Sequence, residues 1–102
     1  MAFTNTTQQQ VVPLFNGENY GYWCIKMKDV LCASSLWEVV ENGIPEVESD
    51  ATNTIDWPKK DAEALAKIHI ATTDTVFPRI MNAVSAKEAW DILKTEFEGT
   101  EK

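Results

Sequence analysis

The stretch that decides the fold is LFNGENYGYWCIKMKDVL, residues 14–31, in which an Asn-Gly turn is followed directly by a helical pattern. Apolar and small residues recur there at the i, i+3, i+4, i+7 spacing, namely Tyr20, Trp23, Cys24, Met27, Val30, Leu31 and Ser34. Asn19 is a favourable N-cap residue, so the sequence predicts one helix from Asn19 to Ser34. The segment before the turn, ending at Phe15, is expected to be extended, because Pro13 disfavours helix at the preceding residue.

The aromatic residues at the start of this helix allow two interpretations. Tyr20 and Trp23 share a face with Met27, and an aromatic stripe at helical spacing is typical of a core. The alternative is a cluster that stacks against a ligand. We expect Tyr20 and Trp23 to anchor the core, whereas Tyr22 and Ile25 point away from the stripe and are available to a partner.

A short helix is predicted next, over residues 36–40. Ser34 or Ser35 can cap its start, and Asn42-Gly43 is a reasonable C-terminal stop. Residues 43–55 then carry proline, serine, asparagine and three acidic residues without a period, which predicts a solvated loop.

A long helix is predicted after this loop, with Asp56 as its N-cap. Pro58 lies in the first turn, where the missing N–H group costs nothing. The apolar spine of this helix is expected to consist of Leu65, Ile68 and Thr72. Pro78 excludes an undisturbed helix interior, so we expect a break near residues 74–77 and a short helix over residues 78–83.

The last helix has the clearest start signal in the chain. Ser85 and Glu88 have the spacing of a capping box, in which each side chain satisfies a backbone N–H group. One face then carries Ala86, Ala89, Trp90, Leu93 and Phe97, and Gly99 ends the helix.

The whole chain, with 102 residues, fits one domain. We expect a flexible arm over residues 1–12, a helical domain over residues 13–99 and a short tail over residues 100–102. No segment has a convincing strand alternation. The predicted fold is therefore all-α, a small bundle of four to five helices.

The composition disfavours several classes of partner. The formal net charge is −7, and phosphate neutralisation supplies most non-specific nucleic-acid affinity, so this segment is not expected to bind nucleic acid directly. No signal peptide or membrane-spanning stretch is visible. Cys24 and Cys32 lie about 12 Å apart along one helix, too far for a disulfide. We expect two free thiols and a soluble, cytoplasmic protein.

No catalytic or metal-binding constellation is apparent. His69 is the only histidine, and no metal-ligand spacing surrounds it, so a position at a helix surface or boundary is the better interpretation. Glu46, Glu48 and Asp50 lack the pattern of a calcium loop and indicate a solvated acidic segment. We expect no enzyme activity, no cofactor and no metal.

Two motifs resemble the Gag polyprotein of plant copia-type LTR retrotransposons. The first is a Phe-x-Gly-x-Asn-Tyr-x-x-Trp pattern, followed by a Met and a Leu on the same helix and then by a Leu-Trp pair. The matching residues are Phe15, Gly17, Asn19, Tyr20, Trp23, Met27, Leu31, Leu36 and Trp37. The second is an Ala-Lys-Glu-x-Trp-x-x-Leu segment, matched by Ala86, Lys87, Glu88, Trp90 and Leu93, and Trp57 fits the tryptophan that often opens the intervening helix.

The resemblance implies a fold like the N-terminal part of a capsid and a role in self-assembly into virus-like particles. It applies equally to a host gene derived from such an element. The zinc knuckle that contacts RNA in the family is not present in this sequence. The alternative function is a host protein-interaction module that binds a peptide or helix in a groove between helices. The candidate interface residues are Tyr22, Ile25 and Lys26, with Lys28 beside them.

Overall fold

The computed structural model describes residues 12–45 and 55–99. In these residues it has five helices and no named strand, with bounds α1 Tyr20–Ala33, α2 Trp37–Asn42, α3 Trp57–Ile70, α4 Phe77–Ile80 and α5 Ala86–Phe97. The predicted all-α fold is confirmed for this part of the chain. The arm before Val12, most of the acidic loop and the tail lie outside the described residues, so the domain limits stay a prediction.

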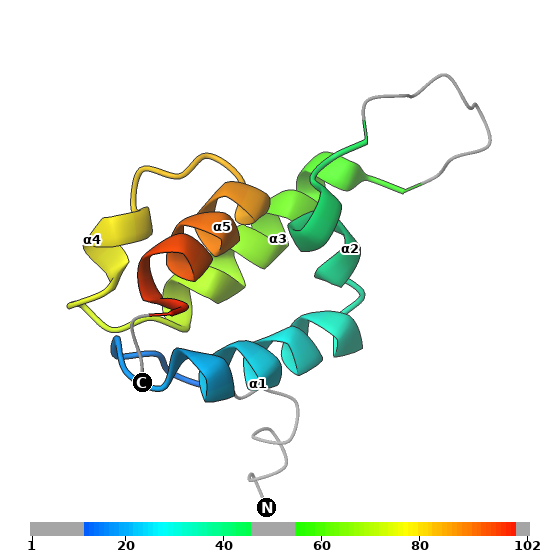
Figure 1. Ribbon diagram of the computed structural model, residues 1–102. Coiled ribbons are helices and arrows are strands. Elements are labelled where there is room, and N and C mark those ends of the chain that lie inside the picture. The colour runs from blue at the N-terminus through cyan, green and yellow to red at the C-terminus, as the bar shows by residue number, and fades with distance from the viewer. Residues whose placement is uncertain (1–11, 46–54, 100–102) are drawn as a thin grey trace, which may run out of the picture.

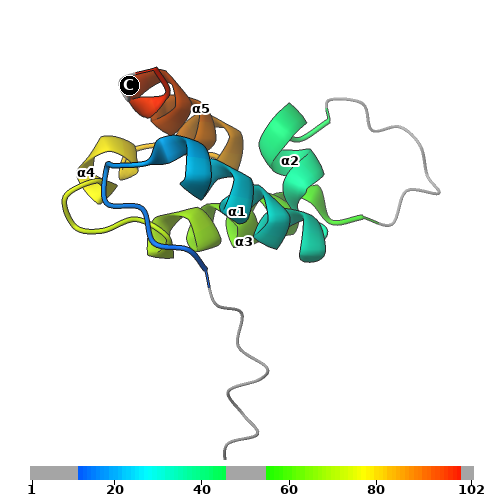
Figure 2. The ribbon, with the colours of Figure 1, turned by 60° about the horizontal axis from the view of Figure 1, so that its bottom comes forward.

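The helices are arranged around a pair formed by α3 and α5, which lie side by side (Figure 1). α2 packs against both members of this pair, and α4 packs against α5. α1 runs along the opposite edge of the molecule and reaches α2 at its C-terminal end (Figures 1 and 2). α1 therefore meets the α3–α5 pair mainly through long side chains.

Aromatic side chains bridge the space between α1 and α5. The ring of Phe15 stacks on Trp23 at a centroid distance of 4.9 Å, and Trp23 stacks on Trp90 of α5 at 5.4 Å. Phe97 meets Phe15 edge-on at 5.0 Å, and Trp37 meets Trp90 edge-on at 5.3 Å. The indole N–H of Trp23 donates to the carbonyl of Pro13 at 2.9 Å, which satisfies its polar group in the core.

The predicted core stripe of α1 is confirmed but narrower than expected. Tyr20, Trp23, Met27 and Leu31 are buried, whereas Cys24, Val30 and Ser34 are only partly buried. The other helices cover only one side of α1, so positions at the flanks of the stripe stay in contact with solvent. The prediction that Tyr20 and Trp23 belong to the core is therefore correct.

The segment before α1 is tied to the end of α3. The amide of Phe15 donates to the carbonyl of Ala71 at 2.7 Å, and the amide of Thr73 donates to the carbonyl of Phe15 at 3.0 Å. These two bonds form an isolated parallel bridge between Phe15 and Thr72. Phe15 is extended, as predicted. Thr72 is buried, but its place in the spine of α3 was wrong because that helix ends at Ile70.

The turn into α1 lacks the side-chain hydrogen bond that was expected from its N-cap residue. Asn19 lies at the N-cap position with a φ of 60°, and its side chain makes no capping hydrogen bond. Its left-handed backbone conformation is one that asparagine tolerates better than most residues. Asn16 supplies the side-chain bond instead, since its Oδ1 accepts from the amide of Glu18 at 3.0 Å. Asn19 is therefore the N-cap residue, as predicted, but its side chain does not supply the expected capping hydrogen bond.

The starts of α2 and α4 were also misplaced. α2 begins after Leu36 without a side-chain cap, because Ser34 Oγ donates back to the Val30 carbonyl at 3.0 Å and Ser35 has a φ of 61°. α4 spans Phe77–Ile80 rather than residues 78–83, with Pro78 in its first turn. The break before α4 is close to the expected position.

The caps of α3 and α5 confirm the sequence analysis. Asp56 Oδ1 accepts from the amide of Lys59 at 3.1 Å, and Ser85 Oγ accepts from the amide of Glu88 at 3.1 Å. The Glu88 carboxylate accepts from the amide of Val84 at 3.0 Å, one residue earlier than in a capping box. The first turn of α5 thus satisfies two backbone donors, as predicted, with a shifted partner.

We predict that Trp23→Ala lowers the free energy of unfolding by about 3–5 kcal/mol, the usual cost of emptying a large buried aromatic site. The indole lies between Phe15 and Trp90 and is 4% exposed, so its loss removes the contact between α1 and α5. Urea denaturation followed by circular dichroism measures the change. Tyr22→Ala is the matched control, and a cost below about 1 kcal/mol for Trp23→Ala would contradict the assignment.

We also predict that neither cysteine forms a disulfide, so that both react with a thiol reagent in the unfolded protein without reductant. Cys24 is partly buried, Cys32 is exposed, and both are unbridged in the structure. The exposed Cys32 should therefore react with iodoacetamide faster than Cys24 in the folded protein. Mass spectrometry after alkylation reads both results, and an intramolecular disulfide between them would contradict the continuous helix α1.

Candidate interaction surface

The predicted interface residues lie on the solvent side of α1. The side chain of Tyr22 is 76% exposed and that of Ile25 is 64% exposed. Lys26 and Lys28 are exposed on the same helix. The expectation that these side chains point away from the core is confirmed, whereas their role as an interface stays a prediction.

These residues do not open onto one common hollow. Tyr22 and Lys26 line a hollow of about 370 Å³ between the start of α1 and the extended segment before it. We call it the Tyr22 hollow; its lining residues are Pro13, Leu14, Asn16, Glu18, Asn19, Tyr22, Trp23 and Lys26. Leu14, 63% exposed, adds a second large apolar side chain beside Tyr22.

Ile25 and Lys28 line a different hollow, of about 400 Å³, between α1, α2 and α5. We call it the three-helix hollow. Its aromatic side chains are Tyr20, Trp37 and Trp90, and the Lys28 ammonium lies 5.1 Å from the centroid of the Trp37 ring. Charges of both signs line its rim, namely Lys28, Lys94, Glu41, Asp91 and Glu98.

The phenol of Tyr20 stays neutral at the wall of the three-helix hollow. Burial raises the pKa of Tyr20 well above its usual range, and the nearby acidic groups Cys24, Glu98 and Asp91 act in the same direction. A neutral phenol is a weak nucleophile. The aromatic wall therefore offers apolar contact area rather than acid–base chemistry at neutral pH.

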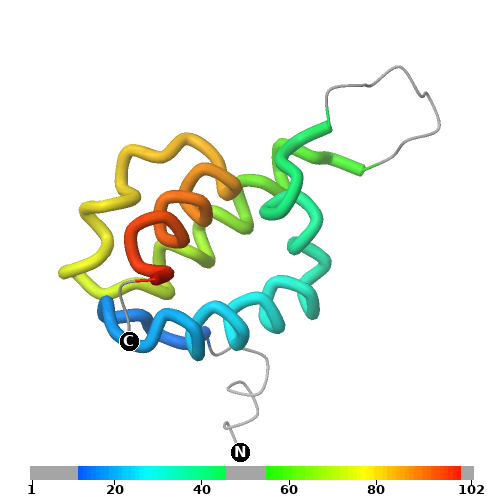
Figure 3. Tube along the Cα trace, viewed as in Figure 1, coloured from blue at the N-terminus to red at the C-terminus, as the bar shows by residue number. Residues whose placement is uncertain are grey.

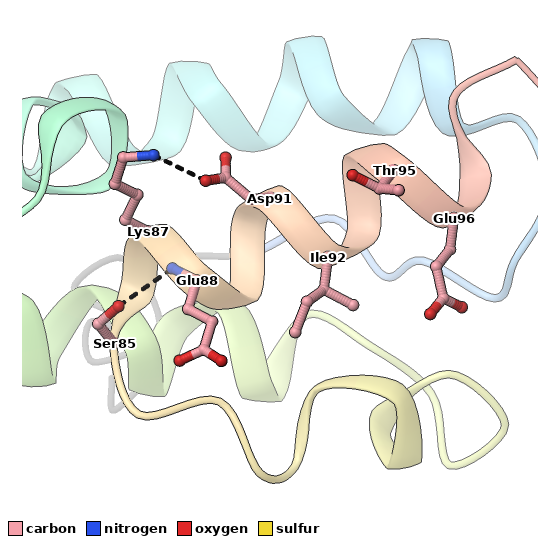
Figure 4. Close-up of a pocket in the computed structure, with 7 residues that line it drawn as sticks. All are labelled: Ser85, Lys87, Glu88, Asp91, Ile92, Thr95 and Glu96. Atoms are coloured by element: carbon pink, nitrogen blue, oxygen red, sulfur yellow. Dashed lines mark hydrogen bonds and ion pairs between the residues drawn. The ribbon is translucent and has the colours of Figure 1, made fainter.

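A further hollow, of about 460 Å³, follows one helix, α5 (Figure 4). Its three acidic side chains each have a structural partner. Glu88 accepts from the Val84 amide, the Asp91 carboxylate lies 2.7 Å from Lys87, and the Glu96 carboxylate lies 3.2 Å from Arg79. These carboxylates stabilise α5 and its connection to α4, and none is held close to a nucleophile.

His69 lies at a helix boundary, as predicted. It is partly buried near the end of α3, and its ring meets Phe77 edge-on at 5.0 Å. Its Nε2 is buried without a hydrogen-bond partner among the described residues, as is Nε1 of Trp57. Within the described ranges no three His, Cys, Asp or Glu side chains gather closely enough to hold a metal ion. Glu46, Glu48 and Asp50 lie outside those ranges.

Sequence reasoning missed Leu14 and Glu18 as parts of the exposed surface. Tyr22 and Lys26 stand four residues apart on α1, whereas Glu18 lies in the turn before that helix, which begins at Tyr20. The helical period gave no signal for Glu18, because the left-handed Asn19 separates it from the helix. Leu14 gave no signal either, because its neighbour Phe15 is buried and only the bridge to Thr72 sets which of the two points outward.

The motif residues quoted above build the core and one turn. Phe15, Tyr20, Trp23, Met27, Leu31, Leu36, Trp90 and Leu93 are buried, and Trp37 and Trp57 pack against them partly buried. Gly17 and Asn19 have φ values of 100° and 60°, so both shape the turn into α1. A φ near 100° favours glycine, which explains that position of the motif.

Comparison with known families places these observations in context. The family described as gag-polypeptide of LTR copia-type matches residues 27–102, so the match includes most of the core but begins after the first aromatic pattern. Comparisons with curated proteins and with solved structures gave no significant match. In the described part of the chain no helix is long and apolar enough to cross a bilayer. The chain belongs to the copia-type gag-polypeptide family of LTR retrotransposons.

Proposed function

We propose that this chain is a non-enzymatic assembly domain, and that copies of it associate through the solvent side of α1. The observation that carries the proposal is the exposure of three large apolar side chains there, Leu14, Tyr22 and Ile25. Exposed apolar residues that gather on one surface are typical of interaction sites. Membership of a Gag family supports a structural rather than a catalytic role.

The proposal includes a capsid-like use of the domain in the cytoplasm. Assembly proteins work through weak contacts that each subunit makes several times, so modest affinity per contact is sufficient. The net charge of −7 opposes the approach of two copies and also disfavours direct nucleic-acid binding. The exposed apolar side chains favour a second copy of the chain as the partner once salt screens this repulsion, whether the protein serves an element or a host.

We predict that the protein forms oligomers that grow with concentration and with added salt. Salt screens the repulsion between acidic copies, since the Debye length falls from about 10 Å at 0.1 M to about 3 Å at 1 M. The double variant Tyr22→Ala, Ile25→Ala should lose these oligomers while it keeps its far-UV circular dichroism. Light scattering coupled to size-exclusion chromatography follows the association.

The matched control is the double variant Met81→Ala, Val84→Ala. Both residues are exposed and apolar, and both lie between α4 and α5 rather than on α1 or the segment before it. This control should associate like the wild type. A wild-type protein that stays monomeric near millimolar concentration in high salt would overturn the assembly proposal.

A second candidate function is the binding of a peptide or helix from another protein. The three-helix hollow favours it, because an aromatic wall with charges of both signs at the rim resembles the grooves that accept an amphipathic helix. This function needs Ile25 and Lys28 but does not need Tyr22, which lies in the other hollow.

We predict how single variants separate the two functions. If a helical peptide selected from a random library binds in the three-helix hollow, Ile25→Ala should weaken its binding about tenfold and Tyr22→Ala should leave it unchanged. Isothermal titration calorimetry measures both dissociation constants. Equal losses in both variants would place the peptide elsewhere and would argue against this second function.

A further inference from the structure

An acidic, an aromatic and a basic side chain line the Tyr22 hollow, Glu18 from the turn before α1 and Tyr22 and Lys26 from α1 itself. Glu18, Tyr22 and Lys26 follow each other at four-residue steps and line the same hollow. All three are exposed, and Leu14 lies in the wall beside them. The aromatic residue thus stands between one negative and one positive charge.

Neither Glu18 nor Lys26 forms an ion pair within the described part of the chain. The ion pairs found there are Arg79–Glu96 and Lys87–Asp91, and neither involves Glu18 or Lys26. Lys28, the other cation of α1, lies over the Trp37 ring in the three-helix hollow. Glu18 and Lys26 are therefore available to a group outside this chain.

When two copies of this series face each other in opposite directions, the acidic group of each copy meets the basic group of the other. We propose that two copies pair through the Tyr22 hollow about a two-fold axis at Tyr22, with Lys26 of each copy against Glu18 of the other. This inference rests on the proposed assembly function and specifies its contact. Glu18 precedes α1 and Lys26 lies on it, and both line the hollow with Tyr22. A two-fold axis that brings Lys26 of one copy to Glu18 of the other therefore also makes the reciprocal pair.

Other arrangements of the same surface fit less well. A parallel pair of α1 helices in register would place Glu18 against Glu18 and Lys26 against Lys26. The two-fold pair is thus the arrangement that opposite charges favour.

The apolar and charged groups have different parts in this contact. Exposed ion pairs contribute little affinity, so Tyr22 and Leu14 supply the buried apolar area. The charges fix the direction and register of the pair, since the wrong register brings like charges together. Charge exchange is therefore the sharpest test of the arrangement.

The experiment compares three kinds of sample: each of the single variants Glu18→Lys and Lys26→Glu, an equimolar mixture of the two variants, and one chain that carries both substitutions. At about 0.15 M salt, where the Debye length is about 8 Å, each single variant should weaken self-association at least about tenfold. An equimolar mixture should regain dimers that contain one copy of each variant, and the doubly exchanged chain should again pair with itself. Sedimentation equilibrium measures the association, and native mass spectrometry reads the composition of the dimers.

If self-association depended only on the net charge of the chain, the two single variants would change it in opposite directions. Glu18→Lys makes the chain two units less negative, and Lys26→Glu makes it two units more negative, so net charge alone would strengthen association in the first and weaken it in the second. Glu63→Lys and Lys59→Glu make the same changes on α3 and serve as controls. The two-fold contact requires that both α1 variants weaken and that neither control does so by a similar factor.

A crosslink tests the axis independently. Tyr22→Cys, in a chain with Cys24→Ser and Cys32→Ser, should form a disulfide between two copies on air oxidation, because a residue at a two-fold axis meets itself. Ile70→Cys in the same background should not. Failure of both the crosslink and the mixture rescue would overturn the two-fold pair. If the double variant Tyr22→Ala, Ile25→Ala still disperses the oligomers in that case, the proposed assembly function is kept, but it uses another contact. A wild-type protein that stays monomeric would overturn both the assembly function and the two-fold contact.

Discussion

The stack of Phe15, Trp23 and Trp90 is the contact on which the position of α1 depends. α2, α3 and α5 pack directly against one another, whereas α1 joins them through its C-terminal end and through these rings. Phe15 is in turn fixed by two backbone hydrogen bonds to the end of α3. The aromatic residues at the start of α1 therefore help to hold an edge helix in place, and with it the surface of that helix that faces solvent.

The elements that sequence reasoning predicted well are those with a strong local signal. The stripe of α1, the caps at Asp56 and Ser85 and the break before α4 all depend on residues a few positions apart. The errors concern places where distant contacts decide. Asn19 and Ser35 adopt left-handed conformations that let the chain turn toward its neighbours, and Thr72 leaves the helix to pair with Phe15, which is far away in sequence.

The candidate surface was predictable in part for the same reason. The helical period shows that Tyr22 and Ile25 point away from the core, but it cannot show that they open onto different hollows. That division results from what packs on either side of α1, namely the segment around Leu14 on one side and α2 with α5 on the other. Assigning each residue to a separate contact required the tertiary arrangement.

The edge-on contact of Phe15 with Phe97 also has a topological consequence. It brings the first and the last parts of the described chain to the same end of the bundle, while the end of α2 and the start of α3, which the link between these helices joins, lie at the far end (Figure 3). Joining the two ends by a short peptide and opening the chain in that link would give a circular permutant with the same helix contacts. In such a chain the extended segment and α1 would follow α5, and Trp23 and Trp90 would lie closer together in sequence than they do in this chain.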